Sequence, residues 1–374
     1  MRSRQTVTVR APAKINLLLH VLGRQPTGSH RVLSLMQMVN LHDRLILTRR
    51  PTRDGIRIVT QNRNLPLGED NLIVRAARAF MKRYGVETGL RIELDKKIPI
   101  GAGLGGGSSD AAATLHGLCR LFRLTPPRTE LAALGQTLGS DLPFFFGGPT
   151  AWVAGIGNEV YPTRLGKNLW AVLVNPGFEV STAWVYSELD RFRSGAPARL
   201  PAGVALRKTF LKKIGLTLDR KRLKILSGKS KAFPLTKRSF SLHNDLEVIT
   251  IRRYPVIETI KERLCSLGAE GVLMSGSGPT VFGLFRDGSS ARSAAAILRR
   301  DKASGRLDRH RDWTIRVARL LNRQTDIRRS SNGRTAAFGA ANWGSSPYLR
   351  TNLPQHEGSW PSGRHTLWNG RTES

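Results

Sequence analysis

The chain has few cysteines and no long hydrophobic run. Only two cysteines, Cys119 and Cys265, occur among the 374 residues, which excludes a disulfide framework and offers no zinc-ligand spacing. We expect both to be buried thiols, because free cysteine behaves as a small hydrophobe. No apolar run reaches the about 20 residues that cross a bilayer, and the first residues lack the apolar core of a signal peptide. The sequence therefore predicts a cytoplasmic protein without membrane contact.

Acidic residues are also scarce. Against 60 Lys and Arg there are 27 Asp and Glu, a formal net charge of +33, and such an excess raises the possibility of nucleic-acid binding. The basic residues are densest in segment 207–238, where Asp219 is the one acid. No zinc-ligand cluster, aromatic RNA-binding signature or GXXG clamp accompanies this segment. We expect a solvated surface insertion, with an RNA-binding patch as the alternative, and a positive field that attracts phosphate-bearing substrates.

Glycine, in contrast, is concentrated in one stretch. Residues 99–110 read PIGAGLGGGSSD and lead into the small-residue segment AAATLHGLC. Glycines permit positive φ and leave no Cβ in the way, so consecutive backbone N–H groups can turn toward one anion. Ser108, Ser109 and Asp110 have the residue types of helix caps, and the start of a helix attracts the same anion through its dipole. The stretch predicts a phosphate-binding loop.

Three other kinds of glycine loop fit less well. A Walker P-loop has Lys and then Ser or Thr after its last glycine, whereas Gly107 is followed by Ser108 and Ser109. Gly101, Gly103 and Gly106 meet the spacing of the dinucleotide fingerprint, but no acidic residue ends a second strand about 20 residues later. A flexible linker continues into polar residues rather than into an alanine-rich helix.

The glycine stretch resembles the phosphate motif of the GHMP family of small-molecule kinases. Residues 11–17, APAKINL, are similar to the family's first motif, and residues 274–282, MSGSGPTVF, to its third. The resemblance covers roughly the first 320 residues, where the periodic pattern stops. It implies a kinase that uses ATP with Mg²⁺ and a small-molecule alcohol. It also implies that the nucleotide is bound by Pro99, Gly101, Gly103, Leu104, Gly105, Gly106, Gly107, Ser108 and Ser109.

Lys14 and Asp141 are the expected catalytic residues. Asp141 lies in a short polar turn between apolar segments, and a carboxylate in such surroundings needs a partner. Lys14 stands in an otherwise apolar strand, and the resemblance implies that the two pair, with Asp141 as the base for the acceptor hydroxyl. From the residues alone, Asp141 can also be a turn cap and Lys14 a surface lysine.

Further blocks resemble one branch of the family, whose acceptor carries a cytidine group. These blocks are residues 71–77, 138–145 and 243–247. The resemblance implies that Asn16, His30 and Tyr186 bind the acceptor; from the residues alone, Asn16 can equally be a satisfied strand amide. Two positions depart from the branch: Thr27 replaces an acid, and Ser29 replaces a tyrosine whose ring stacks on the base. A different alcohol (mevalonate, homoserine or a sugar) and an RNA-binding protein stay open as alternatives.

The periodicity predicts an α+β protein, and the resemblance implies the two-domain GHMP kinase fold with a disordered C-terminal tail. We place an ATP-binding domain at residues 1–165, a C-terminal domain at 166–321 and the tail at 322–374. Nothing in the sequence indicates an oligomeric state, and the metal ligands are not predicted. The expected strands are 6–10, 15–21, 44–48, 90–94, 170–174, 271–274 and 281–285, and the expected helices are 71–84, 111–119, 126–134 and 245–267.

Overall fold

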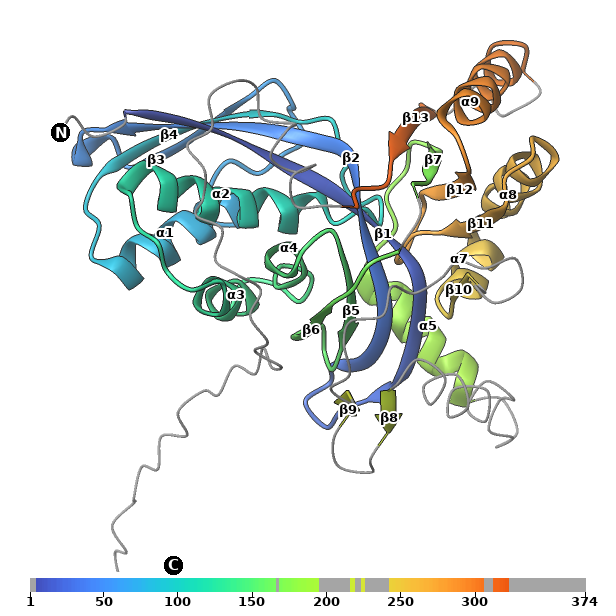
Figure 1. Cartoon of the computed structure of the whole chain (residues 1–374), viewed down its shortest axis with the longest axis horizontal. Coiled ribbons are helices and arrows are strands. Elements are labelled where there is room, and N and C mark those ends of the chain that lie inside the picture. The colour runs from blue at the N-terminus through green and yellow to red at the C-terminus, as the bar shows by residue number, and fades with distance from the viewer. Residues whose placement is uncertain are drawn as a thin grey trace, which may run out of the picture.

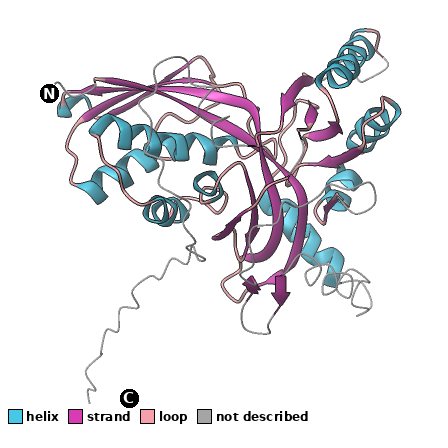
Figure 2. Ribbon diagram, in the orientation of Figure 1, coloured by secondary structure: helices cyan, strands magenta, loops and turns pink. Residues whose placement is uncertain are grey.

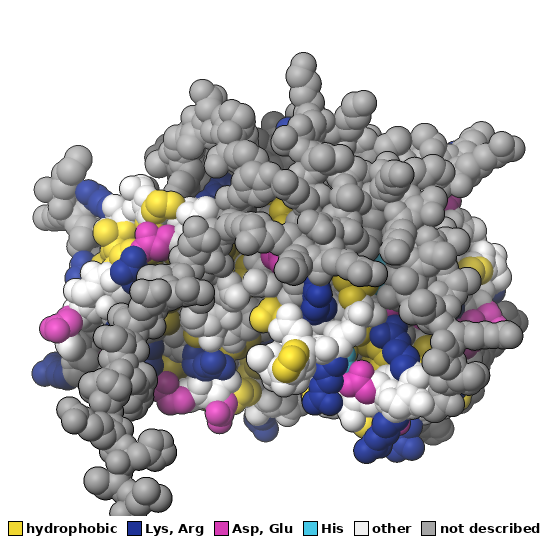
Figure 3. All heavy atoms as spheres, turned by 90° about the horizontal axis from the view of Figure 1, so that it is seen from below, with side chains coloured by type: hydrophobic (Ala, Val, Ile, Leu, Met, Phe, Trp, Pro, Cys, Tyr) yellow, Lys and Arg dark blue, Asp and Glu magenta, His cyan; other side chains and the backbone are white. Residues whose placement is uncertain are grey.

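The computed structural model describes residues 5–165, 168–194, 216–218, 223–225, 242–305 and 312–322. Most of the basic segment 207–238 and the chain after residue 322 lie outside these ranges. The predictions of a surface insertion and of a disordered tail therefore stay predictions. Lys and Arg side chains lie at several separate places on the face shown in Figure 3. None of the described helices is long and apolar enough to cross a membrane.

A large sheet is built around two long strands that run through much of the molecule (Figure 1). Its order is β10-β1-β2-β4-β3, and β5 pairs with β2 and β6 with β5. The pairing of β1 with β2 is antiparallel with three register shifts, which let these strands bend. The members are β1 (Thr6–Arg24), β2 (His30–Arg50), β3 (Ile56–Thr60), β4 (Gly89–Asp95), β5 (Thr150–Ala154), β6 (Glu159–Pro162) and β10 (His243–Asn244).

Helices gather on one side of these long strands, as Figure 2 shows. They are α1 (Leu72–Tyr84), α2 (Gly106–Phe122), α3 (Arg128–Gln136) and α4 (Phe144–Gly147), and the short 3₁₀ helix η1 (Thr52–Asp54) precedes β3. Asn71 caps α1 by accepting a hydrogen bond from Ile73 N–H, and Gly85 ends it in the left-handed region. Small residues let α2 approach the sheet, since a Cβ on Gly117 would lie 3.0 Å from Leu47.

A second, antiparallel sheet has the order β11-β12-β7-β13. Its strands are β7 (Trp170–Asn175), β11 (Gly271–Met274), β12 (Val281–Phe285) and β13 (Thr314–Arg319). The helices α8 (Val256–Ser266) and α9 (Gly288–Ala303) contact this sheet. The remaining elements are α5 (Thr182–Ser194), α7 (Glu247–Arg253) and the pair β8 (Leu216–Leu218) and β9 (Leu223–Ile225). Because β10 pairs with β1, the large sheet also takes a strand from beyond residue 165; the domain boundary stays a prediction.

The mixed helix and sheet architecture confirms the predicted fold class. Two details differ. The helix expected over 245–267 is divided into α7 and α8 at Pro255, because proline disfavours helical geometry in the residue before it. Cys119 is buried as predicted, but Cys265 is exposed, since α8 turns Ile257, Ile260 and Leu264 toward the core and the next position faces away.

Candidate functional site

A cavity of about 810 Å³ opens where β1, the glycine loop and the start of α2 meet α5 and the turn after β11. Every residue that the sequence analysis assigned to the site lines it, except Ser109. The lining therefore combines the expected nucleotide, acceptor and catalytic residues in one space. Its size is within the range of small-molecule sites.

The glycine loop adopts backbone conformations that only glycine takes readily. Gly101, Gly103 and Gly105 have φ of 59°, 73° and 67°. A Cβ on Gly103 would lie 2.0 Å from the carbonyl oxygen of Ser275, so the loop and the turn after β11 are in backbone contact. The loop thus needs glycine both for its conformation and for this close approach.

Helix α2 begins at Gly106, with Gly105 as its N-cap and no side-chain capping bond. The interpretation of Ser108, Ser109 and Asp110 as helix caps is therefore wrong, because the helix starts earlier than their residue types suggest. The amide groups of an uncapped first turn, together with the positive end of the helix dipole, suit an anion. Gly106, Gly107 and Ser108 line the cavity at this point.

Ser109 has a different position from the other residues of the loop. Its hydroxyl donates to the carbonyl oxygen of Pro12 at 2.7 Å, and its side chain is buried. Pro12 belongs to the first motif, residues 11–17. This motif also contacts the glycine loop through the backbone hydrogen bond from Lys14 N–H to Leu104 O, at 2.9 Å. In the structure, Ser109 fastens α2 to β1 rather than facing the cavity.

Lys14 and Asp141 lie together, as the resemblance implied. Lys14 Nζ is 3.4 Å from Asp141 Oδ2, and the lysine side chain is 5% exposed while the aspartate is 33% exposed. Lys14 Nζ also donates to Asn16 Oδ1 at 2.6 Å. Lys14 and Asn16 are two positions apart on β1, so their side chains lie on the same face of the strand. A buried ammonium with a carboxylate open to the cavity can take part in proton transfer at a bound hydroxyl.

Asn16, which accepts the hydrogen bond of Lys14, also bonds to a neighbouring strand. Its Nδ2 donates to Ser34 Oγ at 2.9 Å, and the Ser34 hydroxyl in turn donates to the carbonyl oxygen of Leu18 at 2.7 Å. The amide is thus fixed by its neighbours and faces the cavity with Lys14.

His30 and Tyr186 form a ring pair, with centroids 4.6 Å apart and planes tilted by 31°. His30 Nε2 lies 2.9 Å from Asp190 Oδ2. Burial, with the carboxylates of Asp141 and Asp245, raises the pKa of Tyr186 well above its ordinary value, so its phenol is neutral. Sequence reasoning missed Asp190; its spacing of four from Tyr186 on α5 puts both on one helix face and was the available signal.

Sequence reasoning also missed a buried charge cluster beside the loop. Lys96 Nζ is 2.8 Å from Asp110 Oδ2 and also pairs with Asp43. Burial raises the pKa of Asp110 to about 8, with Lys96 opposing the shift and Asp43 adding to it. Burial lowers the pKa of Lys96, but the two carboxylates outweigh burial and raise it. Lys96 and Asp110 both line the cavity, so the cavity has a second lysine next to the glycine loop.

The turn after β11 connects the two sheets at the site. Ser275 Oγ donates to the carbonyl oxygen of Gly103 at 2.9 Å and accepts from Asn16 N–H at 3.3 Å. Asn244 Nδ2 donates to the carbonyl oxygens of Met274 and Gly276, at 2.9 and 2.7 Å. The third motif therefore holds the glycine loop against β1.

Comparisons with known proteins agree with these observations. Residues 71–148 match the GHMP kinases N terminal domain, and residues 231–304 match the GHMP kinases C terminal domain. Among curated proteins, a 4-diphosphocytidyl-2-C-methyl-D-erythritol kinase of Syntrophotalea carbinolica is 44% identical over 77% of this chain and 92% of its own length. One from Geobacter metallireducens is 39% identical over 85% of this chain and 99% of its own.

The solved structures that resemble this chain include kinases of the same family. A 4-(cytidine 5'-diphospho)-2C-methyl-D-erythritol kinase superimposes with a TM-score of 0.61 at 33% identity, over 84% of this chain and 99% of its own. A homoserine kinase from Cytophaga hutchinsonii has a TM-score of 0.60 at 19% identity, over 87% of this chain and 97% of its own, which shows the shared fold alone. The chain therefore belongs to the GHMP kinases and, within them, to the 4-diphosphocytidyl-2-C-methyl-D-erythritol kinase family.

Proposed function

We propose that the chain transfers the γ-phosphate of ATP to the 2-hydroxyl of 4-diphosphocytidyl-2-C-methyl-D-erythritol, a step of isoprenoid precursor synthesis in the cytoplasm. The observation that carries the proposal is the Lys14–Asp141 pair, 3.4 Å apart, in the same cavity as the glycine loop. Phosphoryl transfer needs a bound triphosphate and a hydroxyl held in line with it. One cavity supplies both, in a member of the family that the comparisons identified.

The triphosphate lies on the backbone amides of the glycine loop and the first turn of α2. Loops of this kind bind phosphate through N–H groups and the helix dipole, and the three positive-φ glycines leave their amides uncovered by side chains. Lys96 also lies at the cavity wall and is 5% exposed, but its charge is balanced by Asp43 and Asp110, so the backbone amides are the main phosphate donors.

The cavity wall also has a donor set that fits Mg²⁺. Mg²⁺ takes oxygen ligands and is commonly held by one or two protein groups together with substrate phosphates. Ser108 and Asp110 line the cavity, and Asp110 Oδ1 is a buried oxygen with no hydrogen-bond partner in the described structure. These are the residues that would hold the ion. When bound with ATP, it neutralises charge on the phosphate oxygens.

The chemistry at the acceptor is a direct displacement. Asp141 accepts the proton of the hydroxyl as its oxygen forms a bond to the γ-phosphorus; the bond from that phosphorus to the bridging oxygen breaks, and ADP leaves with the electron pair. The ammonium of Lys14 stabilises negative charge on the attacking oxygen. No phosphoenzyme forms. Asn16 positions the acceptor, and His30 with Tyr186 holds its cytosine.

A panel of acceptors tests the specificity. ADP release is measured with 4-diphosphocytidyl-2-C-methyl-D-erythritol, mevalonate, homoserine and galactose at matched concentrations, with a catalytically inactive variant as blank. We expect ADP release above the blank with the cytidine compound only. Turnover of mevalonate, homoserine or the sugar, without turnover of the cytidine compound, would contradict the proposal.

A further inference from the structure

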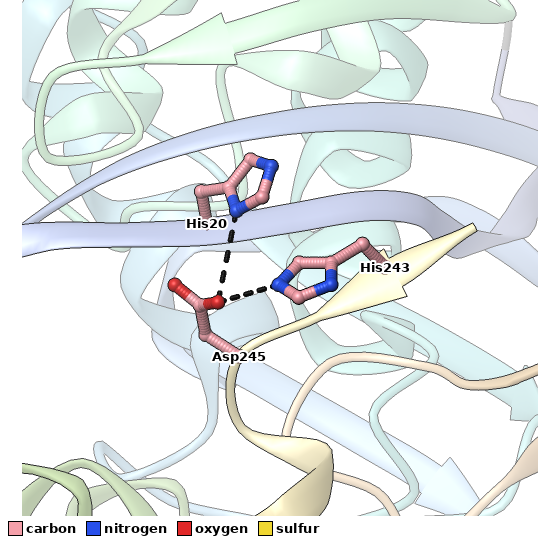
Figure 4. Close-up of side chains that lie close together, drawn as sticks. All are labelled: His20, His243 and Asp245. Atoms are coloured by element: carbon pink, nitrogen blue, oxygen red, sulfur yellow. Dashed lines mark hydrogen bonds and ion pairs between the residues drawn. The ribbon is translucent and has the colours of Figure 1, made fainter. Parts of the chain in front are cut away.

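His20, His243 and Asp245 lie together (Figure 4), next to the cavity-lining residues Leu19 and Leu246, and have no part in the proposed reaction. Within the described residues, their ligand atoms all lie within 4.8 Å of one another. His20 comes from β1 and His243 from β10, and Asp245 directly follows β10. The cluster thus spans the join between the N-terminal strand and a segment more than 200 positions later in the chain.

The three side chains share one carboxylate oxygen. His243 Nε2 is 2.5 Å and His20 Nδ1 is 3.6 Å from Asp245 Oδ1. At 3.6 Å the second contact is too long for a hydrogen bond, and His20 Nδ1 is a buried atom with no hydrogen-bond partner in the described structure. A buried polar atom that makes no hydrogen bond is costly and calls for an explanation.

The other oxygen of Asp245 is held in place. Oδ2 accepts from Val21 N–H at 2.7 Å and from Arg193 Nη2 at 3.0 Å. This leaves Oδ1 directed at the two imidazoles, as Figure 4 shows. A carboxylate that is oriented by such outer bonds is typical of metal ligands.

We propose that His20, His243 and Asp245 form a binding site for a zinc ion. The site takes Nδ1 of His20, Nε2 of His243 and Oδ1 of Asp245, with water as the fourth ligand. Zinc binds imidazole and carboxylate in tetrahedral sites, whereas Mg²⁺ and Ca²⁺ prefer sites made of oxygen alone. A zinc ion would bind Nδ1 of His20, which makes no hydrogen bond in the described structure.

The distances require a small adjustment. Zinc bonds of about 2.0–2.1 Å in a tetrahedron separate the ligand atoms by about 3.4 Å. The His20–Asp245 distance of 3.6 Å already fits, while the His243–Asp245 distance must open by about 1 Å. His243 is 47% exposed and lies on a two-residue strand, so it has room to move. The proton on its Nε2 passes to Nδ1 or to solvent.

The position of the site indicates a structural role. Leu19 and Leu246 line the cavity, and their neighbours His20 and Asp245 carry the metal ligands. Successive residues of a strand point to opposite faces, so His20 on β1 points away from the cavity that Leu19 lines, and none of His20, His243 and Asp245 lines it. The ion therefore lies behind the wall and not among the reacting groups. It connects β1 to the segment of Asn244, whose side chain donates hydrogen bonds to the third motif.

The test uses the full chain after treatment with a chelator. Zn²⁺ is titrated by calorimetry and followed by thermal unfolding, and Co²⁺ by its visible absorption. We expect one ion per chain, a Tm several degrees higher with Zn²⁺, and the absorption of tetrahedral Co²⁺. In His243→Ala, an exposed position, affinity falls at least about 100-fold and the Tm shift is lost. His42→Ala, a histidine outside the cluster, binds as the wild type does.

Two results would overturn the zinc site. One is equal affinity in the wild type and in His243→Ala, which would place the ion elsewhere. The other is a wild-type chain that takes up no Zn²⁺ and gives no tetrahedral Co²⁺ spectrum. The cobalt spectrum needs no variant, so the proposal stays testable if a substitution prevents folding.

Discussion

Asp141 is the residue on which the proposed chemistry most depends. Its carboxylate pairs with a nearly buried lysine and is one-third exposed toward the cavity. Replacement by Asn keeps the shape and removes the base, so kcat falls by at least about 100-fold. ATP affinity is unchanged because the glycine loop is intact. Steady-state ADP release and ATP titration measure the two quantities.

Asp70→Asn is the matched control, since Asp70 also lines the cavity but is exposed, and the ion pair of Lys14 in the described structure is with Asp141. Its kcat stays close to the wild-type value. If Asp141→Asn retained wild-type turnover, Asp141 would not be the base.

Ser29 offers a test of base recognition. It lines the cavity next to His30, whose ring pairs with Tyr186. The resemblance implies a stacking tyrosine at this position, where this chain has Ser29. A stacking ring contributes about 1–3 kcal/mol per base. We expect Ser29→Tyr to lower KM for the cytidine compound at least about 5-fold with little change in kcat. Ser29→Leu adds bulk without a π-face, and an equal gain there would argue against stacking.

Residues within motifs were predictable, and residues that meet only in space were not. Lys14, Asp141, His30 and Tyr186 line the cavity as expected. Asp43, Lys96 and Asp110 form an ion cluster from three segments, and no local pattern marks such a cluster. Ser109 lies inside the motif, yet its hydroxyl binds Pro12, because side-chain direction depends on where α2 begins.

At the scale of elements, the glycine loop depends on its contact with the turn after β11. Gly103→Ala adds a methyl group 2.0 Å from Ser275 O at a φ of +73°. Gly85→Ala has a similar φ of +61°, in the left-handed region, but meets nothing within 4 Å. Gly103→Ala therefore adds backbone strain and a steric clash, which together lower the free energy of unfolding by about 3 kcal/mol or more. The control change adds backbone strain alone, about 1–2 kcal/mol. Urea unfolding and ATP titration of both variants measure the difference; equal losses would contradict the contact.

A histidine in helix α2 makes the stability of the fold depend on pH. Burial lowers the pKa of His116, packed against Phe146, to about 4 from an ordinary 6.5, with Arg128 and Arg120 adding to the shift. Between pH 6.5 and 4 the unfolded chain therefore binds a proton that the folded chain does not, and stability falls as pH falls. When the pH is lowered from 7 to 5, we expect the free energy of unfolding of His116→Gln to fall by about 1–2 kcal/mol less than that of the wild type, as measured by urea unfolding. Identical losses would contradict a buried neutral imidazole.

Element types were predictable where the periodicity was strong, as in α1, β4 and β12. Long-range pairing was not. The segments 6–10 and 15–21 belong to one strand, β1, because pairing with β2 continues across Pro12 through a register shift. The break at Pro255 between α7 and α8 was visible in the sequence as a proline, but the expected helix ran through it.

At the scale of the whole molecule, two sheets close one cavity through a few polar contacts. Ser275 binds both Gly103 and Asn16, and Asn244 binds the carbonyl oxygens on either side of Ser275. The resemblance implied that Lys14 and the glycine loop serve one site, and both line this cavity. It did not predict that β10 joins the first sheet, since a two-residue strand leaves no periodic signal.

The account rests most on where the triphosphate and the acceptor hydroxyl lie. A crystal structure with a non-hydrolysable ATP analogue, Mg²⁺ and the cytidine acceptor tests this directly. We predict the terminal phosphates within hydrogen-bond distance of backbone N–H groups between Gly103 and Ser108, and the acceptor hydroxyl in contact with Lys14 and Asp141. A triphosphate bound away from these amides, or an acceptor hydroxyl remote from both side chains, would contradict the account.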